Sequence, residues 1–314
     1  MYESDELLSI RAAELYYEED KTQDEIGQIL CVTRWKVGRL LAQAKSKGFI
    51  RIEIVHPRAR RVQLERRMRD ELGLQDAVVV SNVGARTAED VQGRTTQAAA
   101  DYLTALRPVP RLLGVSWGRT MHDLAGRLNT GWAAGVNVVQ INGGMSLNQR
   151  PGTAAATALA IAQKAGGQAA LLPSPAILER LETKQAIESD RVVASVLEMA
   201  RAAKGYLFTA GQADHDSAHV ISGYLSRTDI DELVRKGAVG DVVGHYINAE
   251  GEVVDPALDA RTIGLDLEEL RAAPVTIAVI AGTPKHPIAR AVVRSGLAKV
   301  LITDEATALA LLDD

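Results

Sequence analysis

Two spacings of apolar residues alternate along the chain, and they predict two kinds of structure. From the N-terminus to about residue 57, apolar residues recur three and four positions apart, as on the buried face of short helices. From Ala77 onward, short runs rich in Val, Ile and Leu alternate with helical stretches and end near Gly, Ser, Asn, Pro or Asp. This order predicts an all-α N-terminal part and a C-terminal α/β part with a largely parallel sheet.

The stretch "KTQDEIGQILCVTRWKVGRLLAQAKSKG", residues 21–48, predicts two helices joined by a tight turn. Thr22 is the expected N-cap of the first helix, with Glu25 as its capping-box partner. Gly27 is small enough to allow close approach of the second helix, and Cys31 lies in the turn, where a left-handed conformation would cost about 1–2 kcal/mol. The apolar residues expected to be buried by the first helix are Ile26, Ile29 and Leu30.

The second helix combines an apolar face with a basic one. Thr33 can cap it, and Val37, Leu40 and Leu41 recur on one side. This arrangement predicts a helix-turn-helix whose second helix enters the major groove, and a helical hairpin that contacts only protein is the alternative. The candidate DNA contacts are Thr33, Arg34, Trp35, Lys36 and Arg39.

The flanking segments complete a three-part organisation. "LLSIRAAELYY" predicts a packing helix before the pair, and "GFIRIEIVHP" alternates like a short strand, which suggests a wing. "RARRVQLERRMRDELGL" is helical and could link domains or pair with a partner subunit. We therefore expect a DNA-binding domain at 1–57, a linker helix at 58–75 and an effector-binding and oligomerisation domain at 76–314.

Charge is distributed unevenly along the chain. Residues 33–69 hold twelve Arg and Lys against Glu53 and Glu65, a local balance of +10, so the rest carries −14 to reach the net charge of −4. A basic segment on an acidic protein is typical of a polyanion-binding module. One cysteine excludes an internal disulfide, and no signal peptide or membrane span is recognisable. A cytoplasmic location is expected.

Candidate chemistry lies at the expected strand ends, where α/β sheets bind ligands. "GVSWGRT", residues 114–120, has the G-x-S-x-G pattern of a nucleophile elbow, for which Asp255 and His286 could complete a hydrolase triad. The same loop could capture phosphate at a helix N-terminus through Ser116, Gly118, Arg119 and Thr120. It could also be a plain tight turn, and the pattern alone leaves the three readings open.

Three further stretches carry polar or glycine residues of interest. In "NGGMS", Asn142 precedes Gly143 and Gly144, which allow close approach of a ligand or merely a turn. In "AGTPKHPIARAV", Lys285 could meet a phosphate or carboxylate at the mouth of a helix. In "ADHDSAH", His215 and His219 have a spacing that can chelate a metal, but no third ligand is marked, and we expect neither a metal nor a cofactor.

The order of these segments along nearly the whole chain resembles the SorC-type (deoxyribonucleoside-regulator-like) family of sugar-responsive bacterial transcription regulators. The resemblance rests on the helix pair, "GVSWGRT", "QINGGMS" and the closing "AGTPKHPIARAVVRSGLAKVLITDEATALALL". It implies a helix-turn-helix joined to a domain similar to sugar-phosphate isomerases and CoA-transferase-type folds. It also implies tetramers, effectors that are phosphorylated sugars or polyols, and no catalysis.

Carried over by position, the "GVSWGRT" loop and Lys285 look like phosphate-holding elements. Asn142 stands where one branch of the family has a lysine that reacts with an aldehyde sugar, so no Schiff base is expected, although Asn142 and Gln212 can hydrogen-bond hydroxyl groups. The expected effector contacts are Ser116, Trp117, Gly118, Arg119, Thr120, Asn142, Gly143, Gly144, Gln212 and Lys285.

We therefore predict a transcription regulator of a carbohydrate or polyol catabolic operon. Its expected partners are double-stranded operator DNA, a small phosphorylated sugar or polyol, and copies of itself, with no membrane contact. The alternative is an enzyme, either sugar-phosphate isomerase-like or a serine hydrolase that uses Ser116.

Overall fold

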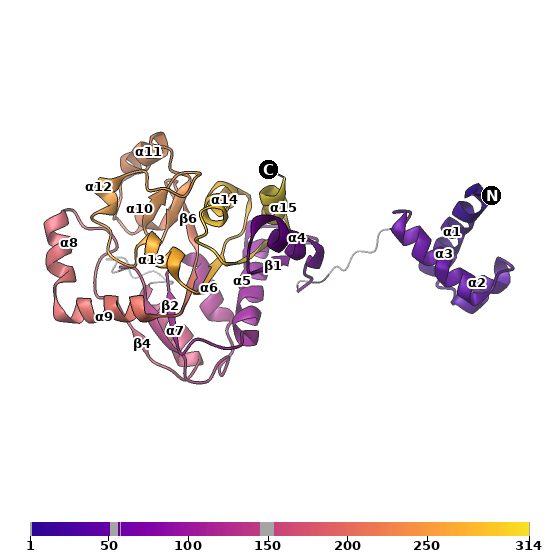
Figure 1. Ribbon diagram of the computed structural model, residues 1–314, viewed down its shortest axis with the longest axis horizontal. Helices are drawn as coiled ribbons and strands as arrows, with labels where there is room; N and C mark the ends of the chain where they lie inside the picture. Colours follow the sequence, from indigo (N-terminus) through magenta and orange to yellow (C-terminus); the bar gives the residue numbers. More distant parts are fainter. Residues whose placement is uncertain (1, 51–55, 57, 145–153, 314) are drawn as a thin grey trace. The chain divides into compact units, whose positions relative to one another are not determined.

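The chain forms two compact units, Met1–Val55 and His56–Asp314, each described here by itself (Figure 1). The structure, a computed structural model, describes residues 2–50, 56, 58–144 and 154–313. Most of the expected wing falls on residues 51–55 and 57 and so lies outside the described residues. Within the described part, no helix is long and apolar enough to cross a membrane.

In its described residues, 2–50, the first unit forms three helices: α1 (Tyr2–Tyr17), α2 (Gln23–Ile29) and α3 (Arg34–Ser46). Thr22 caps α2 as expected: its backbone N–H donates to Glu25 Oε2 at 2.8 Å, and the Glu25 N–H donates to Thr22 Oγ1 at 3.3 Å. Thr33 caps α3 by accepting from the Lys36 N–H at 3.2 Å. These short-range bonds satisfy N–H groups that helix ends leave free, so they set where both helices begin.

The core of this unit lies between α1, α2 and α3. Ile26 is fully buried against α1 and α3, and Leu30 is partly buried. The expectation that Ile29 is buried is wrong, because its side chain is 50% exposed. On a helix of two turns, Ile26 and Leu30 form the line that packs, and Ile29 lies to one side of it.

The turn between α2 and α3 is tight. Cys31 has a φ of 53°, so it adopts the left-handed conformation that disfavours a non-glycine residue. A Cβ at Gly27 would lie 2.8 Å from the Val32 carbonyl oxygen, so glycine lets α2 approach the turn. The result is two short helices joined by four residues, with Arg34 and Arg39 exposed on α3.

The second unit is built on a seven-stranded, fully parallel sheet in the order β1-β10-β9-β5-β2-β3-β4. The short apolar runs expected from Ala77 onward form the strands of this sheet, which confirms the largely parallel sheet. The strands are β1 (Asp76–Val80), β2 (Leu112–Val115), β3 (Asn137–Gln140), β4 (Ala169–Ala170), β5 (Gly205–Phe208), β9 (Val275–Val279) and β10 (Val300–Asp304).

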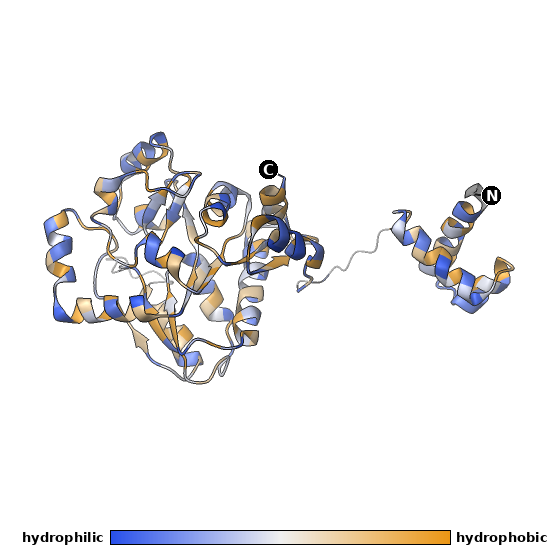
Figure 2. Ribbon diagram, viewed as in Figure 1, coloured by the Kyte–Doolittle hydropathy of each residue, from blue (hydrophilic) through white to orange (hydrophobic). Residues whose placement is uncertain are grey.

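Helices cover both faces of this sheet. Neighbouring strand residues point in opposite directions, so both faces carry apolar side chains that the helices bury. Leu207 packs with α5 (Ala88–Ala105), α6 (Arg119–Arg127) and α7 (Ala154–Lys164), whereas the adjacent Phe208 packs with the helices of the other face. Figure 2 shows the strands as mainly apolar. The helices of the second face are α4 (Val62–Leu72), α9 (Arg191–Ala202), α13 (Leu267–Ala272), α14 (His286–Arg294) and α15 (Glu305–Leu312).

A small antiparallel sheet, which the sequence did not predict, lies beyond the end of β5. It contains β6 (Ala210–Gln212), β7 (Gly240–Val242) and β8 (His245–Ile247) in sequential order. The remaining helical elements are α8 (Leu181–Glu188), α10 (Ala218–Ile221), α11 (Arg227–Arg235), α12 (Pro256–Asp259) and the 3-10 turn η1 (Thr283–Lys285).

The direction of the chain across the parallel sheet reverses between β2 and β5. From β2 the chain proceeds outward through β3 to β4, whereas β5 leads through β9 to β10 on the other side. In open α/β sheets, the carboxyl ends of the strands at such a reversal leave a crevice that binds ligands. The loops after β2 and β5 are therefore the first place to look for a site.

Candidate functional site

The loop after β2 is held against the end of β5 and then starts a helix that has no side-chain cap. The Ser116 N–H donates to the Leu207 carbonyl at 3.0 Å, and the Ser116 hydroxyl accepts from the Thr209 N–H at 3.4 Å. Gly118, at a φ of 135°, stands at the N-cap of α6 and offers no side chain to its first N–H groups. A helix N-terminus with free donors attracts anions.

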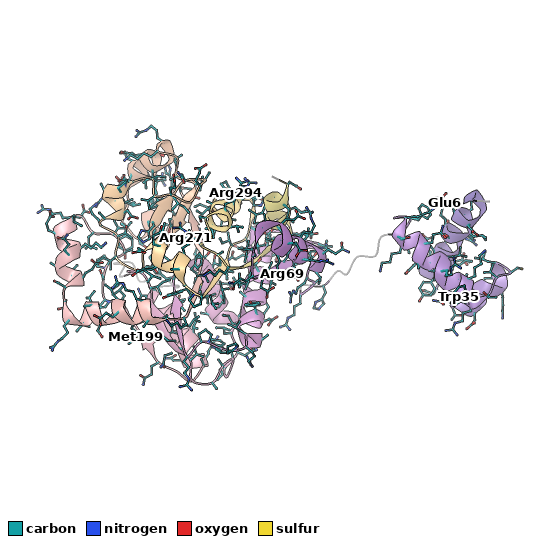
Figure 3. All side chains as sticks on the ribbon, in the orientation of Figure 1. Glu6, Trp35, Arg69, Met199, Arg271 and Arg294 are labelled. Carbon is teal, nitrogen blue, oxygen red and sulfur yellow. The ribbon has the colours of Figure 1, made fainter. Side chains whose placement is uncertain are left out.

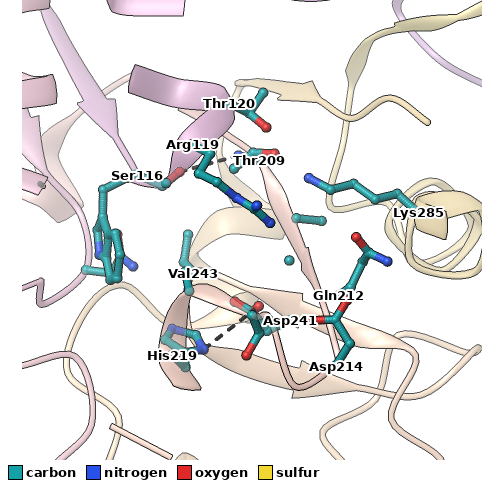
Figure 4. Close-up of a pocket in the computed structure, with 17 residues that line it drawn as sticks. Ser116, Arg119, Thr120, Thr209, Gln212, Asp214, His219, Asp241, Val243 and Lys285 are labelled. Atoms are coloured by element: carbon teal, nitrogen blue, oxygen red, sulfur yellow. Dashed lines mark hydrogen bonds and ion pairs between the residues drawn. The ribbon is translucent and has the colours of Figure 1, made fainter. Parts of the chain in front are cut away.

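A cavity lies at this point, and most of the predicted effector contacts line it (Figure 4). It joins a wider hollow against the start of α5, with which it shares Arg119, Thr120, Gln212 and Lys285. Of the predicted contacts, those in the cavity wall are Ser116, Trp117, Gly118, Arg119, Thr120, Asn142, Gln212 and Lys285.

Gly143 and Gly144 are outside the cavity wall. A Cβ at Gly143 would lie 2.0 Å from the Pro175 carbonyl oxygen, and one at Gly144 would lie 2.4 Å from the Cβ of Ala154. The Gly143 carbonyl also accepts from the indole N–H of Trp117 at 2.8 Å. The double glycine therefore permits close packing behind the cavity and orients Trp117.

Two cations reach the cavity from different elements. Arg119 begins α6, Lys285 ends η1, and both side chains point toward the same space (Figure 4). Desolvation lowers the pKa of Lys285 to about 8, with Arg119 contributing in the same direction and Asp241 and Asp214 opposing it. At neutral pH Lys285 is thus still protonated, but it lies close to its titration point.

Hydrogen-bond acceptors gather on another part of the wall. Asp241 and Asp214 come from β7 and from the segment after β6, and Figure 4 shows them across from Lys285. The Asn142 side chain is 3% exposed, and its Oδ1 atom is buried without a hydrogen-bond partner. Because an unpaired buried oxygen costs about 1–3 kcal/mol, Asn142 is suited to accept a hydrogen bond from a ligand.

Aromatic rings form a further part of the wall. With its N–H engaged by Gly143, Trp117 lies edge-to-face with the His219 ring, at 6.1 Å between centroids. His219 Nδ1 lies 3.0 Å from the Tyr246 hydroxyl, and burial raises the pKa of Tyr246, with Asp241 adding to the effect. These contacts fix His219, so the cavity combines cations, acceptors and a rigid aromatic surface.

Comparison with known proteins decides the class. A family model described as "Putative sugar-binding domain" matches residues 56–313. The chain is 32% identical to the deoxyribonucleoside regulator of Bacillus subtilis, over 98% of this chain and 97% of the relative. It is 28% identical to the erythritol catabolism regulatory protein EryD of Brucella abortus, over 99% and 98%.

A solved structure agrees along nearly the whole length. The full-length sorbitol operon regulator SorC of Klebsiella pneumoniae has a TM-score of 0.73 and 25% identity, over 97% of this chain and 98% of that one. The chain belongs to the SorC-type family of sugar-binding transcriptional regulators. Its named relatives are regulators, not enzymes.

In this SorC-type regulator, the hydrolase hypothesis for Ser116 is wrong on geometry as well as on relationship. The nucleophile elbow places its serine in a strained turn, yet the positive φ of this loop is at Gly118, and Ser116 is not among the non-glycine residues with positive φ. Asp255 caps α12 and binds Lys236 at 2.8 Å, and His286 is outside the cavity wall. The triad is not assembled.

The two histidines of "ADHDSAH" also have separate partners. His215 Nε2 lies 2.7 Å from Asp231 Oδ1, whereas His219 faces Tyr246. Across the described ranges, no cluster of three or more His, Cys, Asp or Glu side chains could hold a metal ion.

On α3 of the regulator, the predicted DNA contacts differ in their surroundings. Arg34 lies 3.4 Å from Asp24 and Lys36 lies 3.3 Å from Asp5, in exposed or half-exposed ion pairs. Trp35 is 73% exposed and projects from the helix (Figure 3), and the Arg39 guanidinium lies 5.1 Å from its ring centroid. Thr33 serves as the cap.

Several cavity residues were missed from the sequence. They lie in the second sheet and in the segments beside it, where no glycine-rich or motif-like signal marks them. The stretch "ADHDSAH" was considered, but as a possible metal site rather than as part of a sugar site. The missed residues include Thr209, Asp214, Ser217, His219, Asp241 and Val243.

Proposed function

We propose that this regulator controls a carbohydrate or polyol catabolic operon by binding operator DNA through α3 and a phosphorylated sugar or polyol in the cavity. The observation that carries the effector proposal is the division of the cavity wall. Donors for an anion come from Arg119, Lys285 and the uncapped start of α6, and acceptors for hydroxyl groups come from Asn142, Asp214 and Asp241. A ligand with a phosphate at one end and hydroxyl groups at the other matches both.

The phosphate belongs at the cationic end on electrostatic grounds. Charge-assisted hydrogen bonds from Arg119 and Lys285 are about twice as strong as neutral ones. Near Asp214 and Asp241 a phosphate would instead face two carboxylates. Ser116 and Thr120 add hydroxyl groups beside the start of α6, and Trp117 offers an apolar face to the carbon skeleton.

Calorimetric titration of matched free and phosphorylated ligands tests this assignment. Erythritol and deoxyribose belong in the set, because the names of two relatives refer to erythritol and deoxyribonucleosides. We expect the phosphorylated form to bind at least tenfold more tightly, about 1.4 kcal/mol. Arg119→Ala should narrow that gap, whereas Arg227→Ala, an exposed arginine on α11, should not. Equal affinity of free and phosphorylated forms would contradict the phosphate assignment.

The DNA proposal rests on the exposed basic face of α3. Arg39→Ala should weaken specific binding by about 1–3 kcal/mol if Arg39 reads a base. Lys45→Ala, at the other end of the same helix, removes the same charge and should weaken binding to all sequences alike. Gel-shift titrations at fixed salt on operator and scrambled DNA separate the two effects. An Arg39 variant that keeps full discrimination would exclude base reading by this residue.

Two finer features of the proposal follow from the family, the homotetramer and the likeness to sugar-phosphate isomerases, and both stay predictions. The wing, expected from the alternation in residues 48–57, and the cytoplasmic location also stay predictions. Sedimentation analysis of the full chain would test the tetramer.

A further inference from the structure

A buried carboxylate holds the turn that carries Lys285. Asp304, the last residue of β10, is 1% exposed, and its Oδ2 atom accepts from the Gly282 N–H at 2.8 Å, immediately before η1. Its Oδ1 atom accepts from Asn82 Nδ2 at 3.0 Å. Burial alone would raise the pKa of Asp304, but hydrogen bonds from Thr307, Gly282 and Asn82 hold it below its usual value. The carboxylate is therefore charged at neutral pH and fully engaged.

The next residue, Glu305, reaches in the other direction. Its Oε2 atom accepts from the Asn82 N–H at 3.2 Å, and its Oε1 atom lies 2.8 Å from Arg61 Nε. The Glu305 and Arg61 side chains are only 23% and 22% exposed, so salt screens this ion pair less than the surface pairs of α4. From adjacent positions at the start of α15, Asp304 thus holds the Gly282 turn and Glu305 holds Arg61, and both accept from Asn82.

Arg61 belongs to the segment that leads to the N-terminal unit. β1 is an edge strand, and residues 59–61 lie along its outer side: Arg61 N–H donates to the Val79 carbonyl at 2.8 Å, and Ser81 N–H donates to the Ala59 carbonyl at 2.9 Å. α4 and α15 pack on this edge (Figure 1). Glu305 therefore fastens the end of the segment at the point where it joins the sheet.

We propose that Asp304 and Glu305 are positioning residues that tie the Lys285 turn to the Arg61 segment, so that an anion at Lys285 changes how firmly this segment is held. The inference rests on the proposed function, because it needs an anionic ligand at Lys285. An anion that draws Lys285 and η1 toward α6 pulls on the Gly282–Asp304 bond. Since Asp304 and Glu305 are consecutive in the chain, the strain reaches Arg61 through one hydrogen bond, from Gly282 to Asp304, and one ion pair, between Glu305 and Arg61. A ligand acts in this way only if its affinity differs between the two arrangements of the segment.

The test is hydrogen exchange on the full chain, with inorganic phosphate as the first probe and the tightest sugar phosphate from the titrations as the second. In the wild type, ligand should protect residues 116–121 and 282–285 and should also change exchange at 58–62 and 79–82 by about threefold or more, as local opening free energies shift. In Glu305→Gln, which keeps an acceptor for Asn82 but loses the charge facing Arg61, the protection at 116–121 and 282–285 should persist and the change at 58–62 should disappear.

Glu71→Gln is the matched control. It removes the same charge from the exposed Arg67–Glu71 pair on α4, at 2.8 Å, and should leave both responses intact. Effector affinity of Glu305→Gln should stay within twofold of the wild type, while the ratio of operator affinities with and without effector should move toward one.

The outcomes separate the two proposals. If no phosphate-bearing ligand protects residues 116–121 in the wild type, the effector proposal fails. If ligand protects those residues in both proteins and the change at 58–62 survives in a folded Glu305→Gln variant, the positioning role of Glu305 is overturned.

Discussion

Cys31 and Val243 both adopt the left-handed backbone conformation, with φ values of 53° and 49°, but their side chains lie in opposite surroundings. Cys31 is exposed in the turn between α2 and α3, whereas Val243 is 3% exposed between β7 and β8 and lines the cavity. This conformation costs a non-glycine residue about 1–2 kcal/mol. At Val243 the burial of a branched side chain offsets that cost. The exposed side chain of Cys31 has no such burial to offset it.

The cations of the two units also differ in how far they are exposed to solvent. Arg39 stands in solvent beside an exposed Trp35, whereas Lys285 is partly enclosed and has a pKa lowered to about 8. An exposed cation acts on a polyanion through contacts that salt weakens. An enclosed one acts at short range, and its charge depends on pH.

The largest expected effect is therefore a pH dependence of effector binding. Above pH 8 the free protein loses the Lys285 proton, which a bound phosphate must restore, so affinity should fall by up to tenfold per pH unit, about 1.4 kcal/mol. Below pH 8 Lys285 is charged with or without ligand, and this source of pH dependence vanishes. Titration of the phosphate itself does not contribute to this slope, because its second pKa is about 6.

Calorimetry between pH 7 and 9.5 measures this slope. Lys285→Arg supplies the control, since arginine stays protonated throughout the range. A wild-type affinity that is flat to pH 9.5 would show that Lys285 does not meet the ligand's charge.

A smaller effect is expected at Val243. Val243→Gly relieves about 1–2 kcal/mol of backbone strain. It also removes a buried side chain that stabilises the fold by about 1.5–3 kcal/mol. Glycine loses more backbone entropy on folding, which costs about 0.5–1 kcal/mol more. The balance predicts a net loss of about 1–2 kcal/mol of stability, together with weaker effector binding. Denaturation of the second unit and ligand titration measure the two parts. A gain in stability would mean that the packing of Val243 does not offset its strain.

The features that the sequence predicted correctly are those set by contacts between residues close together in the chain. Thr22, Glu25 and Thr33 act on N–H groups three residues away, so the starts of α2 and α3 could be predicted from the local sequence. The parallel strands were readable because each is a short apolar run. Ser116 and Lys285 were found because they follow such runs.

The acceptor side of the cavity could not be found in this way. Asp241 meets the cavity because β7 pairs with β6, a contact between residues about thirty positions apart that no local pattern marks. The double glycine was a misleading signal of another kind. Gly143 and Gly144 do exclude side chains, but the atoms that need the space belong to Pro175, Ala154 and Trp117 rather than to a ligand.

The smallest expected effect is at the turn of the N-terminal unit. Cys31→Gly should stabilise this unit by about 0.5–1 kcal/mol, because relief of about 1–2 kcal/mol of strain exceeds the extra entropy that glycine loses on folding. The exposed Cys31 thiol makes only a 3.8 Å contact with the Gln28 carbonyl, so little else is lost. Hydrogen exchange of the amides in α2 and α3, measured in the full chain, reports the change in local opening free energy.

Asp20 provides the matched control for Cys31, since it has the same φ of 53° in the same unit. Aspartate tolerates the left-handed region better than most residues, because its short side chain can hydrogen-bond locally. Asp20→Gly should therefore gain less than Cys31→Gly. Operator affinity should be unchanged in both variants, because neither position lies on the basic face of α3. If Cys31→Gly instead destabilised α2 and α3, the exposed thiol would have to contribute more than its strain costs, and the contrast with Val243 would disappear.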